Sequence, residues 1–302
     1  MSVSNKLVIQ KEEKNFIENL KKRENASYTI LYKRYGNPLF NLAYRITGNV
    51  AESEDILQET FVKTYHSIDQ FNGSSKLFTW IYSICLNLCY RHLQSKKYPT
   101  FESIEDLITE SSGWDYRKDK FSEEEWRHYT EKIKDGCLLA LVRCLPFSQR
   151  AAFVLHILLK IPISNIATIL NKSNGSVRVL IFRGKQKIKN FLCSHCSLFK
   201  GGNKCSCMNL VDFSLRNGLI KKIDQKKAAK KSSFHPEIIQ QEINELKKMI
   251  VLYESLKNEN PSPQAIKAIR TAMKNDKKVI FAQKKCNISP SGNQTIKKPG
   301  RR

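Results

Sequence analysis

The chain has 302 residues, of which 41% are hydrophobic, and its formal net charge is +24. This length allows two or three small domains with globular cores. The positive charge indicates a polyanionic partner, and it favours nucleic acid over a membrane because no apolar run approaches the roughly 18 residues of a spanning helix. The first residues lack a hydrophobic signal segment, so we expect a cytoplasmic protein without membrane insertion.

Residues 14–47 are predicted to form two short helices, and Gly36, Asn37 and Pro38 are expected to bend or interrupt the second. Between residues 52 and 68, apolar side chains recur at steps of three and four, which is the period of a half-buried helix. These helices, with the one that follows, are expected to form a bundle.

The opposite side of the helix at 52–68 is polar. Asp55, Gln58 and Glu59 lie three and four residues apart, so their side chains share a patch that can meet a basic partner. A solvated face without a partner is the simpler interpretation.

Small polar residues at 72–75 end this period, because glycine and its polar neighbours favour turns. A second helix is predicted from about Lys76, and its aromatic rings alternate with cations in a way that suits unpaired bases. A packed aromatic core is the alternative, and we expect Trp80 to be partly buried. The rings and cations are Phe78, Trp80, Tyr82, Tyr90, Lys76, Arg91, His92, Lys96 and Lys97.

Three motifs here resemble region 2 of the sigma-70 family, extracytoplasmic-function type, whose members are initiation factors of bacterial RNA polymerase. They are ITGN at 46–49, EDILQETF at 54–61 and TWIYSICLN at 79–87. The resemblance implies docking on the clamp helices of the polymerase β′ subunit through Asp55, Gln58, Glu59 and Lys63. It also implies that the melted minus-ten element is held by Asn72, Ser74, Lys76, Thr79, Trp80, Asn87 and Arg91.

Residues 94–130 show no helical period, and nine carboxylates fall between Glu102 and Glu125. We interpret this segment as an acidic linker. A solvated spacer is the simpler interpretation, while the family resemblance suggests that the linker threads an RNA-exit or template-strand path of the polymerase.

Four further helices are predicted: at 132–145, from an N-cap at Ser148, at 164–170 and at 174–192. The short turn at 171–173 makes the last two a helix-turn-helix, whose second helix lies in the major groove. From residue 150 to 211 there are ten Lys or Arg and no Asp or Glu, so this part can neutralise phosphates.

On the last of these helices, the buried period leaves Ser176, Arg178, Val179, Phe182 and Arg183 outside or at the margin. The arginines can reach guanine or phosphate, and Val179 and Phe182 can touch thymine methyl groups. Phosphate contact alone is the simpler interpretation, and we favour it for the lysines that follow, Lys185, Lys187 and Lys189.

Two motifs in this part, LPFSQRAAFVL at 145–155 and SNGSVRVLIFRGKQKI at 173–188, resemble region 4 of the same family, which reads the minus-35 element. The resemblance implies that Ser176, Arg178 and Arg183 contact DNA, and that the polymerase β flap is a partner. The chain departs from the family pattern at Val179 and Leu180, where small polar and basic residues are usual.

Nine cysteines, an odd number, fit reduced thiols or a metal site better than a disulfide framework. Four of them have helical spacings and are interpreted as core residues: Cys85, Cys89, Cys137 and Cys144. Four others lie within fifteen residues and can close a tetrahedral zinc site: Cys193, Cys196, Cys205 and Cys207. A copper or redox sensor and unliganded thiols are the other interpretations.

An amphipathic helix is predicted at 239–253, before Pro261 and Pro263, and a second at 266–280. The two could fold back as a hairpin that packs on the rest of the chain, with regulation or partner binding as the alternative. Residues 286–302 are basic and expected to be disordered.

The sequence therefore predicts an all-α protein with small bundles at 14–94 and 131–192, joined by an acidic linker at 95–130. A cysteine-rich segment at 193–211, a helical extension at 212–285 and the tail follow.

The resemblance implies a sigma factor that binds core polymerase and promoter DNA, with an anti-sigma factor as a further expected partner. The alternative is a polymerase-independent helix-turn-helix regulator with a metal- or redox-sensing cysteine cluster. No nucleophile–base pair, P-loop or acidic metal cluster appears in the sequence, so we do not expect an enzyme.

Overall fold

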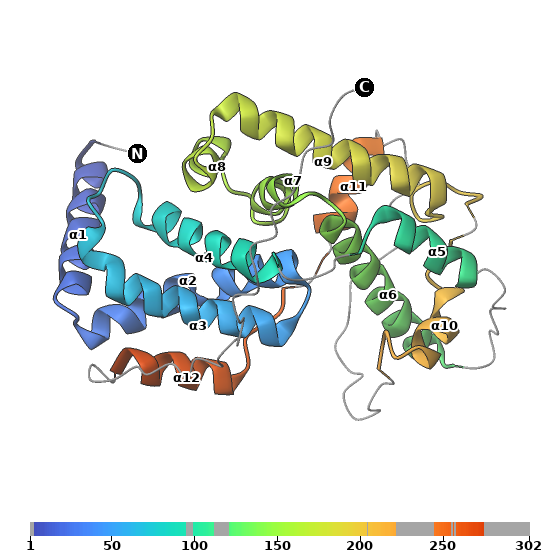
Figure 1. The fold of residues 1–302 in the computed structure, drawn as a ribbon, viewed down its shortest axis with the longest axis horizontal. Coiled ribbons are helices and arrows are strands. Elements are labelled where there is room, and N and C mark those ends of the chain that lie inside the picture. Colours follow the sequence, from blue (N-terminus) through green and yellow to red (C-terminus); the bar gives the residue numbers. More distant parts are fainter. Residues whose placement is uncertain are drawn as a thin grey trace, which may run out of the picture.

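A computed structural model describes residues 3–94, 99–111, 121–203, 205–221, 245–254, 256 and 258–274. Within these ranges every named element is helical, which confirms the predicted all-α fold with its two bundles (Figure 1). None of the helices described is long and apolar enough to cross a bilayer.

The first bundle consists of α1 (Val3–Lys21), α2 (Asn25–Thr47), α3 (Val50–Ser67) and α4 (Leu77–Leu93), with a short 3-10 turn η1 (Ile68–Gln70) after α3. The Asn49 side chain caps α3 by accepting a hydrogen bond from the Glu52 amide at 3.2 Å. The predicted interruption of α2 does not occur, because the helix continues through Pro38. Its neighbours Gly36, Leu39 and Phe40 are buried, and this packing offsets the cost of about 3 kcal/mol or more that proline imposes inside a helix.

The segment predicted as a linker contains helices, and this part of the prediction is wrong. Phe101–Ser111 forms α5, and α6 spans Glu123–Arg143, so it begins well before residue 132. Ser122 and Glu125 form a reciprocal capping box at the start of α6. The acidic residues of its first turn lie where the helix dipole favours negative charge, so they mark a helix start.

The second bundle continues with α7 (Phe147–Phe153), a π-helical turn η3 (Val154–Leu158), α8 (Ile163–Leu170) and α9 (Asn174–His195). The predicted N-cap at Ser148 is wrong, because α7 begins at Phe147 and Pro146 precedes it. The predicted turn between α8 and α9 is confirmed: Asn171 adopts φ 50° and the Ser173 side chain caps α9.

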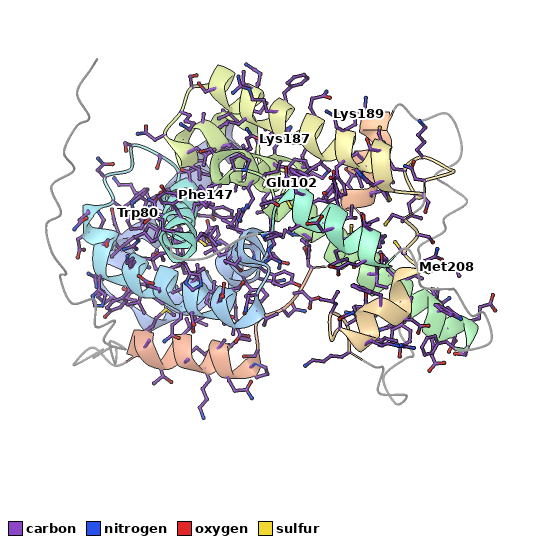
Figure 2. The ribbon with its side chains drawn as sticks, turned by 45° about the vertical axis from the view of Figure 1, so that its right-hand side comes forward. Trp80, Glu102, Phe147, Lys187, Lys189 and Met208 are labelled. Carbon is purple, nitrogen blue, oxygen red and sulfur yellow. The ribbon has the colours of Figure 1, made fainter. Side chains whose placement is uncertain are left out.

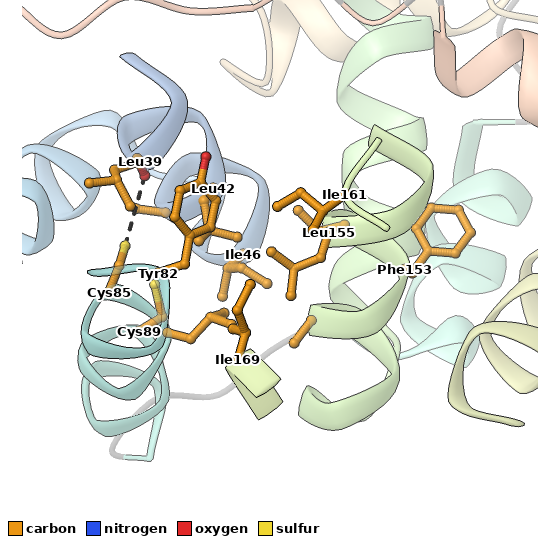
Figure 3. Packing of buried hydrophobic residues seen from close by; sticks show 14 of the residues in the cluster. Leu39, Leu42, Ile46, Tyr82, Cys85, Cys89, Phe153, Leu155, Ile161 and Ile169 are labelled. Atoms are coloured by element: carbon orange, nitrogen blue, oxygen red, sulfur yellow. Dashed lines mark hydrogen bonds between the residues drawn. The ribbon is translucent and has the colours of Figure 1, made fainter. Parts of the chain in front are cut away.

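The two bundles pack directly against each other and share one hydrophobic core. Ile169 of α8 lies near Cys89 of α4, and Leu155 and Ile161 face Ile46 (Figure 3). This confirms that Cys85 and Cys89 are core residues.

Arg150 joins the bundles by polar contacts. Its buried guanidinium donates hydrogen bonds to the Ile46 carbonyl at 3.1 Å and the Leu145 carbonyl at 3.1 Å. Hydrogen bonds from a charged group contribute more than neutral ones, so this side chain helps to fix the orientation of the second bundle.

The C-terminal part contains α10 (Leu210–Arg216), α11 (Glu245–Glu254) and α12 (Pro263–Lys274). Helix α11 packs on η3 and α9, while α12 packs on α3 and α2. The expected packing on the rest of the chain is therefore confirmed, whereas the hairpin is wrong. The beginning of the predicted first helix at 239–244, the end of the second at 275–280 and the tail at 286–302 lie outside the described residues.

Candidate nucleic-acid interface

The acidic patch predicted on α3 is only partly open. Asp55 is exposed, whereas Gln58 and Glu59 are half-buried. The Glu59 carboxylate lies 3.2 Å from the Lys63 ammonium and 3.7 Å from the Arg91 guanidinium of α4. Glu59 therefore ties α3 to α4, and Asp55 is the carboxylate of this set that can meet a partner without losing such a contact.

The loop before α4 presents its predicted residues to solvent. Asn72, Ser74 and Lys76 are exposed, and the Asn72 side chain accepts a hydrogen bond from the Ser74 amide at 3.0 Å. Such a turn, in which an asparagine side chain bonds the backbone two residues on, fixes the shape of the loop.

Three of the residues predicted to contact single-stranded DNA share one side of α4. Trp80, Asn87 and Arg91 are spaced by seven and four residues, so they follow one stripe of the helix. Trp80 is half-buried, and its ring centroid lies 5.3 Å from that of Phe71. Asn87 and Arg91 are exposed.

Thr79 does not belong to this exposed stripe, and its assignment as a nucleic-acid contact is wrong. Its side chain is 2% exposed, and its hydroxyl donates a hydrogen bond to the Lys76 carbonyl at 2.7 Å. Thr79 faces the bundle core because it lies about 100° around the helix from Trp80.

Helix α9 presents the predicted reading face to solvent. Phe182 is 59% and Val179 47% exposed, and Arg178 and Arg183 are also exposed. The opposite side is buried as predicted, through Val177, Ile181, Gly184 and Ile188.

Ser176 and the lysines of α9 differ in their surroundings. The Ser176 amide donates to the Ser173 hydroxyl at 3.1 Å, so Ser176 lies in the capped first turn. Burial and the nearby Lys160 ammonium lower the pKa of Lys185, whereas Lys187 is exposed. Lys187 and Lys189 lie on α9, apart from Trp80 on the first bundle (Figure 2).

The segment that carries the predicted zinc ligands folds back on itself. Cys196 and Cys205 pair through a single backbone bridge, and burial raises the pKa of Cys205 to about 11 and of Cys207 to about 12. In the described residues, no group of three or more His, Cys, Asp or Glu side chains is arranged to hold a metal ion.

Cys137 of α6 is the residue of this cluster that the sequence did not identify. Burial raises its pKa, and proximity to the Cys207, Cys196 and Cys205 thiols adds to the shift. A thiol from α6 therefore lies near Cys196, Cys205 and Cys207, and the spacing of cysteines along the chain could not reveal it.

Two family models match this chain in the order of the two bundles. "Sigma-70 region 2" matches residues 31–98, and "Sigma-70, region 4" matches residues 135–188. The first match covers most of α2 with α3 and α4, and the second covers the last part of α6, then α7, η3, α8 and most of α9.

Curated relatives align over nearly their full length. The ECF RNA polymerase sigma factor SigW of Bacillus subtilis is 28% identical over 59% of this chain and 96% of its own length. The RNA polymerase sigma-H factor of Pseudomonas aeruginosa is 24% identical over 62% of this chain and 96% of its own.

A solved structure, that of CnrH in complex with the cytosolic domain of CnrY, aligns with 60% of this chain and 96% of its own at 17% identity and a TM-score of 0.45. The family assignment rests on the sequence matches, in which both regions occur in order on one chain. The chain is therefore a member of the sigma-70 family, of the extracytoplasmic-function type.

Proposed function

We propose that this chain directs core RNA polymerase to promoters, with its first bundle on the polymerase and the melted strand and its second bundle on upstream duplex DNA. One observation carries this proposal: region 2 is followed by region 4 on one chain. In each region, residues predicted to contact the polymerase or DNA are exposed to solvent. Exposed Asp55 would face the β′ clamp helices. The β flap and an anti-sigma factor stay predictions from the family resemblance.

The exposed stripe of α4 suits an unpaired strand. The Trp80 ring is held by Phe71 and keeps part of its surface free for stacking, while Arg91 and Lys76 supply charge for phosphates. We infer that the loop at 72–76 and this stripe hold the non-template strand of the minus-ten element.

The exposed face of α9 suits a major groove. Arg178 and Arg183 extend from a helix in the segment 150–211, whose sequence contains no Asp or Glu. Phe182 is exposed next to Arg183, where it can meet a thymine methyl group. We infer that this helix reads the minus-35 element.

Replacing Arg183 by Ala is expected to weaken binding of the polymerase complex to DNA selected with the wild-type protein, and to reduce its sequence preference. A bidentate arginine–guanine contact discriminates by about 1–3 kcal/mol. Lys187→Ala is the matched control, and it should weaken binding to all sequences equally and lower the salt dependence. Equal behaviour of the two variants in filter binding or fluorescence anisotropy would show that Arg183 contacts only phosphate.

A polymerase-independent regulator is the second candidate, but it leaves the α3 patch and the α4 stripe unexplained. In-vitro transcription separates the two functions. A sigma factor makes a promoter-dependent start appear when it is added to core polymerase, whereas a repressor or activator does not. The zinc ion suggested by the spacing of Cys193, Cys196, Cys205 and Cys207 stays a prediction, which metal analysis of the purified protein under reducing conditions would test.

A further inference from the structure

The C-terminal extension is anchored to the second bundle through α11. Met249, Leu252 and Tyr253 are buried there. The Tyr253 hydroxyl donates to the Leu138 carbonyl at 3.0 Å, and its ring meets that of Phe153 edge-on at 5.1 Å. A buried tyrosine whose hydroxyl has a hydrogen-bond partner holds its helix in one position, so α11 is part of the folded structure.

The segment between α11 and α12 bonds buried polar side chains of α2. Asn41, only 3% exposed, donates to the Glu259 carbonyl at 3.0 Å and accepts from the Glu259 amide at 3.1 Å. Arg45, 4% exposed, donates to the Asn258 side chain at 2.9 Å. Buried polar groups are costly without partners, so these two side chains are complementary to the extension.

Helix α12 then docks along α2 and α3 (Figure 1). Ser262 caps it by accepting from the Ala265 amide at 3.1 Å, and the Ser262 amide donates to the Glu54 carboxylate at 2.6 Å. Ile269 is 0% exposed and Met273 7% exposed, and both belong to the shared core. The helix is therefore fixed at its start by Glu54 and along its length by apolar contact.

The covered side of α3 borders the predicted polymerase-binding patch. Gln58 follows Glu54 by one turn and is half-buried, and Val62, one turn further, is 6% exposed. Helix α12 carries Lys267, Arg270 and Lys274 and no carboxylate. A basic helix thus lies on the acidic helix where a helical partner would bind.

We propose that α12 and the polymerase helices that bind α3 use overlapping surfaces, so that the C-terminal extension keeps the chain in a closed state. This inference rests on the proposed function. The closed state also holds the second bundle, through α11, and the first, through α12, in one orientation. Polymerase binding then requires α12 to leave α3, and the apparent affinity is reduced by the fraction of molecules in which it is docked.

The test uses the full chain with Ile269→Asp, which places a charge in the α12 contact without changing α3. Thr271→Asp, on the exposed side of the same helix, is the matched control. The apparent Kd for core polymerase is expected to fall about tenfold in Ile269→Asp, as for a closed state that is about 90% populated, and to stay unchanged in Thr271→Asp. Asn258→Ala, which removes the acceptor of Arg45, should act in the same direction by a smaller factor.

A second readout does not need polymerase. In a Gln58→Cys background, alkylation of that cysteine by iodoacetamide, followed by peptide mass spectrometry, should be several-fold faster with Ile269→Asp than with Thr271→Asp. Equal alkylation rates, or unchanged or weaker polymerase binding by Ile269→Asp, would overturn the inference. If no variant binds polymerase while the alkylation rates differ, the result supports the docking of α12 on α3 but contradicts the proposed function.

Discussion

Replacing Asp55 by Lys is expected to weaken binding to core RNA polymerase at least about tenfold while leaving thermal stability unchanged. Asp55 is exposed on α3, and none of the ion pairs in the described residues involves it. Loss of one partner of a charge pair in an interface costs about 2–5 kcal/mol, and reversal adds repulsion. Native-gel or anisotropy titration with core polymerase measures the change.

Glu59 is a poorer position for this test. Its carboxylate contacts Lys63 and Arg91, so a lysine there would also remove these ion pairs, one of which joins α3 to α4. The matched control for Asp55→Lys is Glu18→Lys, an exposed carboxylate on α1 outside the patch. Equal weakening by both variants would assign the effect to net charge and contradict a specific contact at α3.

Replacing Trp80 by Ala is expected to reduce promoter-dependent transcription from duplex DNA by roughly 5- to 100-fold. The reason is the loss of a stacking platform that contributes about 1–3 kcal/mol per base. On a template whose minus-ten region is already unpaired by mismatches, the same variant should recover much of the activity, because strand separation is no longer required. Run-off transcription from the two templates measures the ratio.

Trp80→Phe serves as the control for this variant, because it keeps a ring beside Phe71 and fills most of the half-buried site. It should retain most activity on duplex DNA. A Trp80→Ala protein that is equally impaired on both templates, or loses its helical circular dichroism, would place Trp80 in the core and not at the strand.

The helices that carry the predicted interfaces could be read from the sequence because their apolar period is local. The spacing of Val177, Ile181 and Ile188 gave the buried side of α9, and the structure confirms it. The same spacing, applied to α4, would have excluded Thr79, because it follows the buried side of the helix. The assignment of Thr79 came from the family motif, which does not distinguish packing residues from contact residues.

The beginning of α6 was missed because its acidic composition was interpreted as linker. The local signal was present, since Ser122 and Glu125 have the spacing of a capping box. The position of α12 could not be predicted in this way. It depends on Asn41 and Arg45, whose partners lie more than 200 residues away in the sequence.

Co-migration with core RNA polymerase, followed by transcription from a promoter selected with the complex, tests the central claim most directly. The purified full chain should bind core enzyme, and a defined start should appear only when both are present. A chain that keeps its helical content, fails to co-migrate with core enzyme even with Ile269→Asp, and yields no promoter-dependent transcript would contradict the account.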